Sequence, residues 1–390
     1  MSMHTGATGS AGGADGTGVN GTVAAGWEPV REEFASFIAG EAHSPESQLV
    51  VVHRGRRVVD LWAGEDTDGD TLSGVYSITK GAAHLVVALL AQEGVLDLDR
   101  PVVEYWPEFT GAGKELLTVR QLTAHGSGLI NTPEGFSIEE LADDALVAAR
   151  LAGQQPYWTP GTGYGYHGFV IGALTGEVVR RASGKSLQEV YEERIRAPYG
   201  LDLYLGLPDG LRDRWKPVLA GVPTPEGEAA MAARPAPPEL LPIAFNLHRT
   251  PPMDIVEYGN HPAVIAQGPG AAGGMGSARG VAGLYAAALD GLLKPETLAD
   301  VARLHTPGTD LVTGETDHFG LGFETQPPVG PQAFGHSGAA GGQAFADPVT
   351  GIAYAYTRRR FCFPVQNNAP ENLRFTAAAL RVARETGQAG

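Results

Sequence analysis

The chain of 390 residues is long enough to bury a sizeable core in one large domain or two interlocked ones. Hydrophobic residues make up 43% of it and charged residues 18%, which is ordinary for a globular protein. The net charge of -16 argues against nucleic acid or an anionic membrane surface as a partner.

Cys362 is the only cysteine, so no disulfide can form within the chain, and a reducing compartment is expected. No cluster of Cys and His residues has the spacing of a zinc site. Residues 1–25 are mostly Gly, Ala, Thr and Ser and lack the apolar region of a signal peptide, so we predict a disordered tail. No apolar stretch is long enough to span a bilayer. The sequence therefore predicts a cytoplasmic protein with no metal, no cofactor and no membrane partner.

Apolar spacing and turn residues predict the helices and strands in chain order. A helix over 27–42 is followed by strands over 49–53 and 58–62, joined by the tight turn Arg54-Gly55-Arg56. A mostly apolar helix then covers 77–96. Beyond it we expect short helices and turns over 97–150, helices over 170–182, 186–196 and 277–293, strands over 332–337, 342–346 and 352–357, and a last helix over 371–385.

This order predicts an α/β (α+β) fold in which terminal helices cover one antiparallel sheet. The sheet domain would comprise residues 26–76 and 265–390. A mainly helical domain, residues 77–264, would be inserted into it. Within the insertion, residues 207–262 are rich in Pro and Gly, and we expect them to cross the surface as a lid or pocket wall.

The tetrapeptide Ser77-Ile78-Thr79-Lys80 opens the predicted helix 77–96 and holds the residue types of a catalytic unit. Residues three apart on a helix share a face, and the first turn offers free backbone N–H groups. A serine there can be a nucleophile, with an amine beside it to take its proton and an N–H to hold an oxyanion. Of the five lysines, only Lys80 has a serine three residues before it. A structural explanation stays open for the pair alone, since most such pairs have no catalytic role.

Other segments join the tetrapeptide in a characteristic order and spacing; they are 117–129, 160–168, 273–279 and 334–342. With them, residues 26–386 resemble the serine β-lactamase and penicillin-binding-protein superfamily. The resemblance is strongest to its class C-like branch, which includes family VIII carboxylesterases, D-amino-acid peptidases and natural-product transacylases.

The resemblance implies a β-lactamase/transpeptidase-like fold and a two-step acyl transfer that needs no metal or cofactor. Ser77 would be the acylated nucleophile, and Lys80 and Tyr166 would share its proton. Burial should lower the pKa of Lys80, and the neighbouring cation should lower the pKa of Tyr166. The pair would then act first as a base and later as an acid toward the leaving group. Tyr164 is the rival for the tyrosine role, but Tyr166 has the family's spacing from Pro-Gly-Thr.

The resemblance also implies a substrate-binding strand end in the segment 334–342. The backbone N–H groups of Ser77 and Ala339 would form the oxyanion hole. Gly338 would keep the strand free of a side chain where the substrate lies. His336 would stand where lactamases carry a lysine, and with Ser337 it gives the His-Ser-Gly form found in some D-peptidases. Its role is either direct contact with the substrate or the orientation of water or a loop.

Other chemically active residues have structural explanations. The family uses the segment with His125 and Ser127 as a turn, and His167 is expected to pack nearby. Arg358-Arg359-Arg360 ends a strand and predicts a solvated edge, with a grip on a substrate carboxylate as the alternative. The chain has no Gly-x-Ser-x-Gly elbow and no His-Glu-x-x-His motif. Its glycine-rich matches to dinucleotide loops follow no convincing strand.

Gly168 departs from the family pattern. Lactamases and peptidases of the family have an asparagine two residues after the tyrosine, and it holds the substrate amide. Glycine has no side-chain amide, and this favours esters, from which an alkoxide leaves more easily than an amine. We therefore predict a carboxylesterase-like serine hydrolase or acyl transferase acting on a small-molecule ester. The alternatives are a transacylase of secondary metabolism, a D-amino-acid or DD-peptidase, a weak β-lactamase and, least favoured, a non-catalytic binding module.

Overall fold

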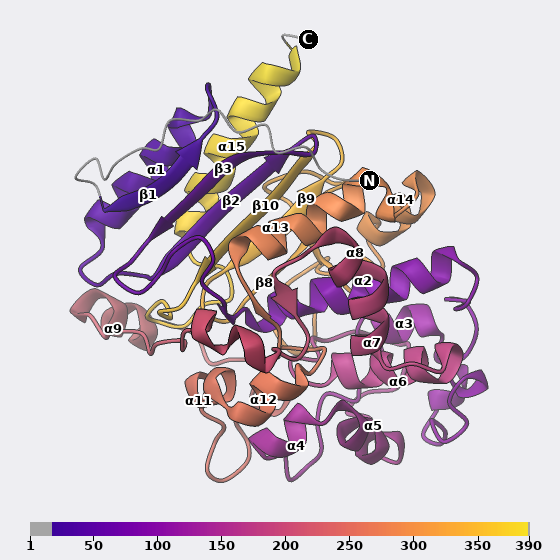
Figure 1. Ribbon diagram of the computed structural model, residues 1–390. Coiled ribbons are helices and arrows are strands. Elements are labelled where there is room, and N and C mark those ends of the chain that lie inside the picture. Colours follow the sequence, from indigo (N-terminus) through magenta and orange to yellow (C-terminus); the bar gives the residue numbers. More distant parts are fainter. Residues whose placement is uncertain (1–17, 389–390) are drawn as a thin grey trace.

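The computed structural model describes residues 18–388, and its frame is one antiparallel sheet (Figure 1). The strands follow the order β1-β3-β2-β10-β9-β8-β7, and every neighbouring pair is antiparallel. The predicted sheet is thereby confirmed, and β2 and β10 bring the two ends of the chain together at its centre. The strands are Val19–Val23 (β1), Ser47–His53 (β2), Arg56–Ala63 (β3), Glu324–Thr325 (β7), Phe334–Ser337 (β8), Gln343–Asp347 (β9) and Ile352–Arg358 (β10).

The hairpin of β2 and β3 shows how local sequence forms this sheet. Leu49, Val50 and Val51 are all buried, because helices cover both faces of the sheet. Arg54 and Gly55 connect the strands with φ angles of +48° and +74°, the left-handed conformation that a tight hairpin turn needs at both positions. The predicted strands and the turn between them are confirmed.

The first and last helices cover one face of the sheet, as the sequence predicts (Figure 1). They are α1 (Glu28–Gly40) and α15 (Glu371–Gln388), and Phe34 of α1 meets Phe375 of α15 edge to face at 5.6 Å between ring centroids. Helix α13 (Ala278–Ala287) covers the other face, against β2, β9 and β10. The sheet is therefore the middle layer of a sandwich between helices.

Strand β1 corrects the prediction of a disordered tail. Residues 1–17 of that tail lie outside the described residues, but Val19–Val23 pair with β3 along the edge of the sheet. Gly21 fits this pairing because a Cβ there would lie 2.0 Å from the Asp60 carbonyl oxygen. The strand is short and lies beside a run of small residues, so composition alone did not reveal it.

The remaining helices gather beside the sheet (Figure 1). Helix α2 (Thr79–Gln92) is buried from Thr79 to Leu90. It follows a 3-10 turn, Tyr76–Ile78 (η1), and stops before Gly94 at φ +74°, so the predicted helix 77–96 is shorter at both ends. The other helices are α3 (Val119–Thr123), α4 (Ile138–Ala142), α5 (Asp144–Ala152), α6 (Ile171–Ser183), α7 (Leu187–Tyr191), α8 (Ala197–Tyr199), α9 (Pro225–Ala232), α10 (Leu241–Ala244), α11 (Ile255–Asn260), α12 (Pro262–Gln267) and α14 (Pro295–Ala302).

The segment 207–262 carries α9, α10 and α11, and it is anchored in the helical part by buried residues such as Tyr258. Its role as a lid or pocket wall stays a prediction. The division of the chain into a sheet domain and an inserted helical domain also stays a prediction. One hydrophobic cluster joins the two parts, since it contains Leu85 of α2 together with Ala344 of β9 and Ala353 of β10.

A second, three-stranded sheet brings the chain before Ser77 beside the chain after Ala271. Val75 donates its N–H to the Gly274 carbonyl at 3.0 Å, and the Gly274 N–H donates to Thr79 Oγ1 at 2.9 Å. The start of α2 is thereby fixed against the segment that leads into α13. The strands are antiparallel in the order β4 (Ser73–Gly74), β6 (Met275–Gly276) and β5 (Leu203–Tyr204).

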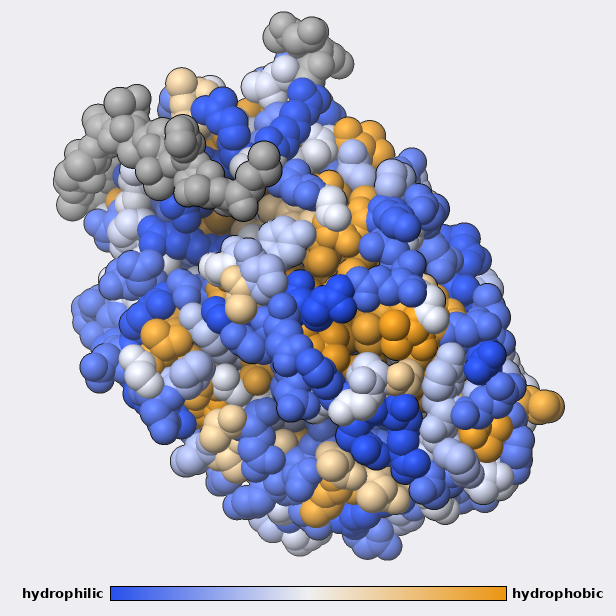
Figure 2. Space-filling model, turned by 45° about the vertical axis from the view of Figure 1, so that its right-hand side comes forward, coloured by the Kyte–Doolittle hydropathy of each residue, from blue (hydrophilic) through white to orange (hydrophobic). Residues whose placement is uncertain are grey.

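The surface drawn in Figure 2 is mostly hydrophilic, with apolar patches between polar and charged residues. The exposed large apolar side chains come from distant parts of the chain, such as Leu116, Val349 and Leu373. Scattered exposure of this kind is normal for a folded protein. Between residues 18 and 388, the helices fall short of the length and apolar character that crossing a membrane requires.

Candidate active site

Ser77 lies in the η1 turn between β4 and α2, where the backbone is unusual. Tyr76 has a φ of +49°, a left-handed conformation that is costly for a residue with a bulky side chain. The Tyr76 ring is buried, and its hydroxyl donates to the Ile255 carbonyl at 2.9 Å. These contacts hold the turn in place and leave the Ser77 side chain half-buried at the start of the helix.

The side chains of Lys80 and Tyr166 converge on the Ser77 hydroxyl. Lys80 Nζ lies 3.0 Å from Ser77 Oγ, and the Tyr166 hydroxyl donates to the same oxygen at 2.6 Å. Lys80 Nζ is also 4.8 Å from the centre of the Tyr166 ring. Tyr164, the rival tyrosine, donates its hydroxyl to the Gly308 carbonyl at 2.7 Å instead. The structure therefore brings together the three residues that the motifs single out.

Lys80 is completely buried, at 0% exposure, and two backbone carbonyls hold its amine. Nζ donates to the Gly168 carbonyl at 2.7 Å and to the Ala271 carbonyl at 2.8 Å. Burial lowers the pKa of Lys80 to about 7, although the negative charge of Glu324 acts to raise it. Near neutral pH much of the lysine is therefore uncharged, with two N–H groups on carbonyls and its lone pair available to Ser77.

Tyr166 does not have the lowered pKa that the sequence predicts. Its side chain is 1% exposed, and burial raises its pKa well above the usual value, with a further contribution from Glu324. The hydrogen bond with Ser77 acts in the opposite direction but is the weaker effect. The prediction was wrong because loss of hydration and the negative charge of Glu324 raise the pKa of Tyr166 by more than the neighbouring groups lower it. Tyr166 is thus a protonated hydroxyl at neutral pH.

The end of strand β8 places His336 and Ser337 around a buried carboxylate. The Ser337 N–H and hydroxyl donate to Glu324 at 2.8 and 2.9 Å. His336 Nδ1 lies 3.2 Å from the same carboxylate, and its ring centroid is 6.0 Å from that of Tyr166. Burial, with Lys80 nearby, lowers the pKa of His336 well below its usual value. His336 is therefore a neutral imidazole packed close to Tyr166.

Gly338 and Ala339 directly follow β8 in the chain, and Gly338 packs against the turn that carries Ser77. A Cβ at Gly338 would lie 2.7 Å from the Val75 carbonyl oxygen and 3.4 Å from the Ile78 side chain, so only glycine allows this approach. Among residues 18–388, neither the Ser77 nor the Ala339 N–H donates to a backbone carbonyl. Both donors are thus available where β8 meets the η1 turn.

Comparison with known proteins agrees with this geometry. The sequence profile of the family described as Beta-lactamase matches residues 20–374. The chain belongs to the β-lactamase family. A relative, the Esterase/beta-lactamase LipL of Mycobacterium tuberculosis, is 30% identical over 85% of this chain and 81% of its own length. Esterase EstB of Burkholderia gladioli is 28% identical over 72% of this chain and 70% of its own.

Solved structures confirm the β-lactamase-type fold. EstA from Arthrobacter nitroguajacolicus Rue61a superposes with a TM-score of 0.84 at 36% identity, over 94% of this chain and 98% of that one. A family VIII carboxylesterase superposes with a TM-score of 0.81 at 32% identity, over 93% of this chain and 99% of that one. The family and the fold that the motifs predict are therefore confirmed.

Gly168 stands where the β-lactamase family pattern has an asparagine, and the structure shows what fills the space. A Cβ at position 168 would lie 3.0 Å from the carbonyl oxygen of Ala244, the last residue of α10. The Gly168 carbonyl accepts the hydrogen bond from Lys80. Position 168 therefore gives the lysine a backbone acceptor and offers no side chain to a substrate.

Buried histidines pack close to Tyr166: His125 lies on the segment that the family uses as a turn, and His167 follows Tyr166 in the chain. His167 Nε2 lies 2.6 Å from Ser127 Oγ, and the His167 N–H donates to His125 Nδ1 at 3.1 Å. Burial lowers the pKa of His125 well below its usual value and that of His167 to about 4, so both are neutral. In the part of the chain that the structure describes, no three His, Cys, Asp or Glu side chains are grouped to hold a metal ion.

Arg358 and Arg359 correct the prediction of a solvated strand edge. Both residues are buried, at 7% and 5% exposure. Arg358 pairs with Glu371 at 2.6 Å, and Arg359 pairs with Glu46 at 2.8 Å. The start of α15 and the loop before β2 cover this edge and neutralise its charge. The two guanidinium groups are thus engaged within the protein, not directed at a substrate carboxylate.

Three polar residues of the site carry no motif and were not predicted. Glu324 holds Ser337, as described above, and Asp310 Oδ1 accepts the Tyr166 N–H at 3.2 Å. The His318 ring centroid lies 6.4 Å from that of Tyr166. The one sequence signal for Glu324 is its position at the end of the glycine-rich apolar run 320–324, shortly before β8.

Proposed function

We propose that this chain is a serine ester hydrolase that works through an acyl-enzyme on Ser77. The observation that carries the proposal is the contact of Ser77 Oγ with a buried lysine at 3.0 Å and a protonated tyrosine at 2.6 Å. Relatives and neighbours described as an esterase/β-lactamase, an esterase and a family VIII carboxylesterase support ester hydrolysis as the reaction.

In the first step, Ser77 Oγ attacks the carbonyl carbon of the ester. Neutral Lys80 takes the hydroxyl proton, because the Gly168 and Ala271 carbonyls hold two of its N–H groups and leave the lone pair toward Oγ. The carbonyl oxygen becomes an oxyanion, and the N–H groups of Ser77 and Ala339 are the proposed donors to it.

In the second half of the step, the C–O bond to the alcohol breaks. Tyr166 donates its proton to the leaving alkoxide, and the Lys80 ammonium returns a proton to the tyrosine. The raised pKa of Tyr166 suits this role, since a hydroxyl that keeps its proton is available as an acid. Water then attacks the acyl-enzyme with the same groups in the same roles, and Ser77 is released with the carboxylic acid as product.

The residue at position 168 bears differently on the alternative functions, which are cleavage of an amide and transfer of the acyl group to another acceptor. A D-amino-acid peptidase, DD-peptidase or β-lactamase expels an amine, and Gly168 has no side chain to hold a substrate amide while its carbonyl is engaged by Lys80. A transacylase shares the acyl-enzyme and differs only in the acceptor that releases it. Transfer to an alcohol or amine is therefore the second candidate.

Intact-protein mass spectrometry tests the proposal. After mixing with p-nitrophenyl butyrate, a β-lactam and a D-Ala peptide separately, we expect a butyryl adduct on Ser77 from the ester. Ser77→Ala should form no adduct and lose turnover by about four orders of magnitude or more, as removal of a nucleophile usually does. Ser127→Ala is the matched control, because its hydroxyl contacts His167 and not the proposed site. Wild-type turnover in Ser77→Ala, or an adduct elsewhere, would overturn the mechanism. Adding an alcohol acceptor separates hydrolysis from transfer.

We further propose that the substrate is a small-molecule ester and that the protein works in the cytoplasm. The single cysteine supports the cytoplasmic setting, since no disulfide can form within the chain. Fractionation of the source cells tests it: the protein should be found with the cytosolic markers, and recovery with the membrane or secreted fraction would contradict it.

A further inference from the structure

A cavity of about 670 Å³ lies beside the end of β8, and most of its wall is polar. Ser337, two residues before Ala339, lines it. His318 also lines it, with its ring 6.4 Å from that of Tyr166. The cavity therefore adjoins the proposed catalytic groups. We call it the amide cavity after the five amide side chains in its wall, Gln326, Gln343, Gln366, Asn367 and Asn368.

The inner wall of the amide cavity is built from buried polar side chains. Gln326 and Gln343 are 4% and 7% exposed, and Gln343 Nε2 donates to Gln326 Oε1 at 2.8 Å. Beside them, the Ser337 hydroxyl donates to the Glu324 carboxylate. An aliphatic group placed here would remove water from these amides without replacing its hydrogen bonds, which is unfavourable. The wall therefore suits a ligand that brings its own hydrogen-bonding groups.

The charges around the cavity do not favour an anionic ligand. His318 Nε2 pairs with Glu315 at 3.0 Å, and its Nδ1 lies 3.5 Å from Asp310. Burial lowers the pKa of His318, but the adjacent carboxylates of Asp310 and Glu315 outweigh this and raise it to about 10. Among the described residues that line the cavity, the one cation, His318, is thus already engaged by two carboxylates. Glu324 adds a further carboxyl group, whose pKa burial raises.

The surroundings of Tyr166 that come from the segment 207–262 are different, because they are apolar. Phe245 lies 5.9 Å from Tyr166 between ring centroids, and Ala244 is completely buried beside it. Tyr166 is therefore packed against apolar residues of this segment on one side, while the amide cavity near its His318 side is polar.

We propose that the amide cavity binds the alcohol half of the ester, and that this half is an uncharged polyhydroxyl group. The proposal rests on the proposed ester hydrolase function. The leaving oxygen must reach the Tyr166 hydroxyl to receive its proton, and the amide cavity begins one ring away from Tyr166, at His318. When the C–O bond breaks, the acyl group stays on Ser77 Oγ and the polyol departs through the cavity with the proton from Tyr166.

Two esters of the same acid test the proposal, glycerol monobutyrate and hexyl butyrate. Release of glycerol or hexanol gives kcat/KM for each, and the common butyryl group makes the acyl-enzyme identical. We expect the wild-type protein to prefer the glycerol ester by about tenfold or more, since several hydrogen bonds to buried amides are at stake. Gln343→Leu should lower this preference by about tenfold. Gln332→Leu is the control and should leave it unchanged, because Gln332 is exposed and outside the wall.

A second variant keeps the test valid if the buried Gln343 proves necessary for folding. Gln366→Leu changes a half-buried amide of the same wall and should also lower the ratio. A wild-type preference for the hexyl ester, or ratios unaffected by both substitutions, would overturn the proposal. Failure of the ester hydrolase itself is distinguishable, because neither ester would then leave a butyryl adduct on Ser77 in the mass spectrum.

Discussion

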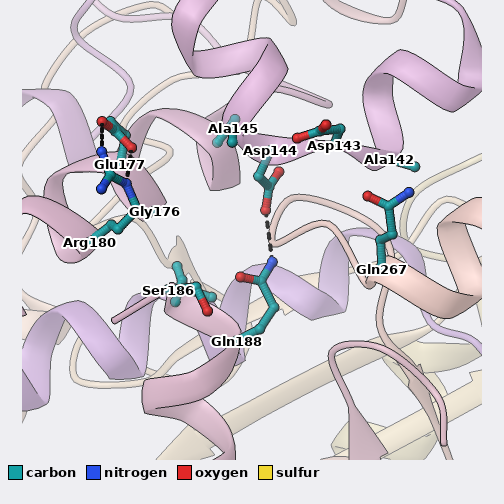
Figure 3. Close-up of a pocket in the computed structure, with 12 residues that line it drawn as sticks. Ala142, Asp143, Asp144, Ala145, Gly176, Glu177, Arg180, Ser186, Gln188 and Gln267 are labelled. Atoms are coloured by element: carbon teal, nitrogen blue, oxygen red, sulfur yellow. Dashed lines mark hydrogen bonds and ion pairs between the residues drawn. The ribbon is translucent and has the colours of Figure 1, made fainter. Parts of the chain in front are cut away.

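Lys80 and Asp144 both have pKa values shifted close to neutrality, and their surroundings differ. Burial lowers the pKa of Lys80 to about 7 and raises that of Asp144 to about 6. Lys80 touches the hydroxyl of Ser77. Asp144 lies at the start of α5 in a separate surface pocket of about 340 Å³, where it accepts from the Gln188 side chain at 2.9 Å (Figure 3). The Gly270 N–H donates to the same carboxylate at 2.9 Å.

The pocket around Asp144 holds groups that are already paired with one another. Glu177 and Arg180 form an ion pair at 2.6 Å (Figure 3). The Ser186 hydroxyl donates to Glu189 as part of the cap of α7. A shifted pKa therefore marks burial in both places, and only the contact with a nucleophile makes one of them a candidate for catalysis.

The backbone around Gly270 and Ala271 connects Asp144 with Lys80. Asp144 holds the N–H of Gly270, and the carbonyl of the next residue, Ala271, accepts from Lys80 at 2.8 Å. A Cβ at Gly172 would lie 2.2 Å from the Ala271 nitrogen, so α6 packs tightly against the same loop. Asp144 is thus a candidate to position the lysine's acceptor without touching the reacting atoms.

Among the substitutions that compare the surroundings of Lys80 with those of Asp144, removal of the lysine amine should give the largest effect. Lys80→Met is expected to lower kcat/KM for p-nitrophenyl butyrate by about 10²- to 10⁴-fold, the usual contribution of a general base. The matched control is Lys114→Met, because Lys114 is equally buried and donates to the carbonyls of Ala152 and Gln154. That variant should lose thermal stability and keep turnover per folded molecule. Equal loss of turnover in the two variants would show that burial, not contact with Ser77, matters.

Loss of the tyrosine hydroxyl should give a smaller effect, because the lysine remains. Tyr166→Phe is expected to lower kcat by about 10²-fold, with the loss greatest for esters whose alcohols are poor leaving groups and need a proton. Tyr164→Phe is the control, since the Tyr164 hydroxyl donates to Gly308. Steady-state rates with p-nitrophenyl and ethyl butyrate measure the difference. A loss independent of the leaving group would contradict an acid role for Tyr166.

The pH dependence separates the lysine from other bases. Because the neutral amine accepts the proton, kcat/KM should rise with pH and level off above about 7, the pKa of Lys80. Glu324 raises that pKa, so Glu324→Gln should move the rising limb to lower pH. Profiles of kcat/KM from pH 5 to 9 measure both. A limb that shifts to higher pH in Glu324→Gln would contradict Lys80 as the titrating group.

The sequence predicts those features that depend on local pattern. The apolar runs of β2 and β3 and the turn at Arg54-Gly55 are contained in a few neighbouring residues, and so is the tetrapeptide with Ser77 and Lys80. Tyr166 could be predicted because its segment has a distinctive spacing from Pro-Gly-Thr.

Features that depend on distant contacts could not be predicted in the same way. Arg359 is buried by its pairing with Glu46, which is 313 residues away in the chain. Glu324 lies in a two-residue strand that exists only because β8 pairs with it. The raised pKa of Tyr166 follows from burial by several segments, while the sequence shows only the nearby lysine.

Substitution of Asp144 should have the smallest effect on rate, because this residue acts through the loop. Asp144→Ala removes the acceptor for Gly270 N–H and should lower kcat by about fivefold, the value of one ordinary hydrogen bond, with KM little changed. Asp144→Asn keeps a side-chain oxygen for Gly270 and should retain most of kcat. Equal kcat values for the two variants would contradict the positioning role.

The stability of the wild-type protein and that of Asp144→Asn should depend differently on pH. The folded-state pKa of Asp144, about 6, lies above its ordinary value of 3.8, so its contribution to the stability of the fold is present in full below pH 3.8 and is lost as pH rises through about 6. The wild-type protein should therefore lose stability relative to Asp144→Asn between pH 4 and pH 7, because the amide does not ionise. Water in the open pocket keeps the effect small. Melting temperatures of the two proteins, measured across that pH range, test this prediction. A difference in melting temperature that does not change with pH would contradict it, because Asp144 would then be as well solvated in the folded protein as in the unfolded chain.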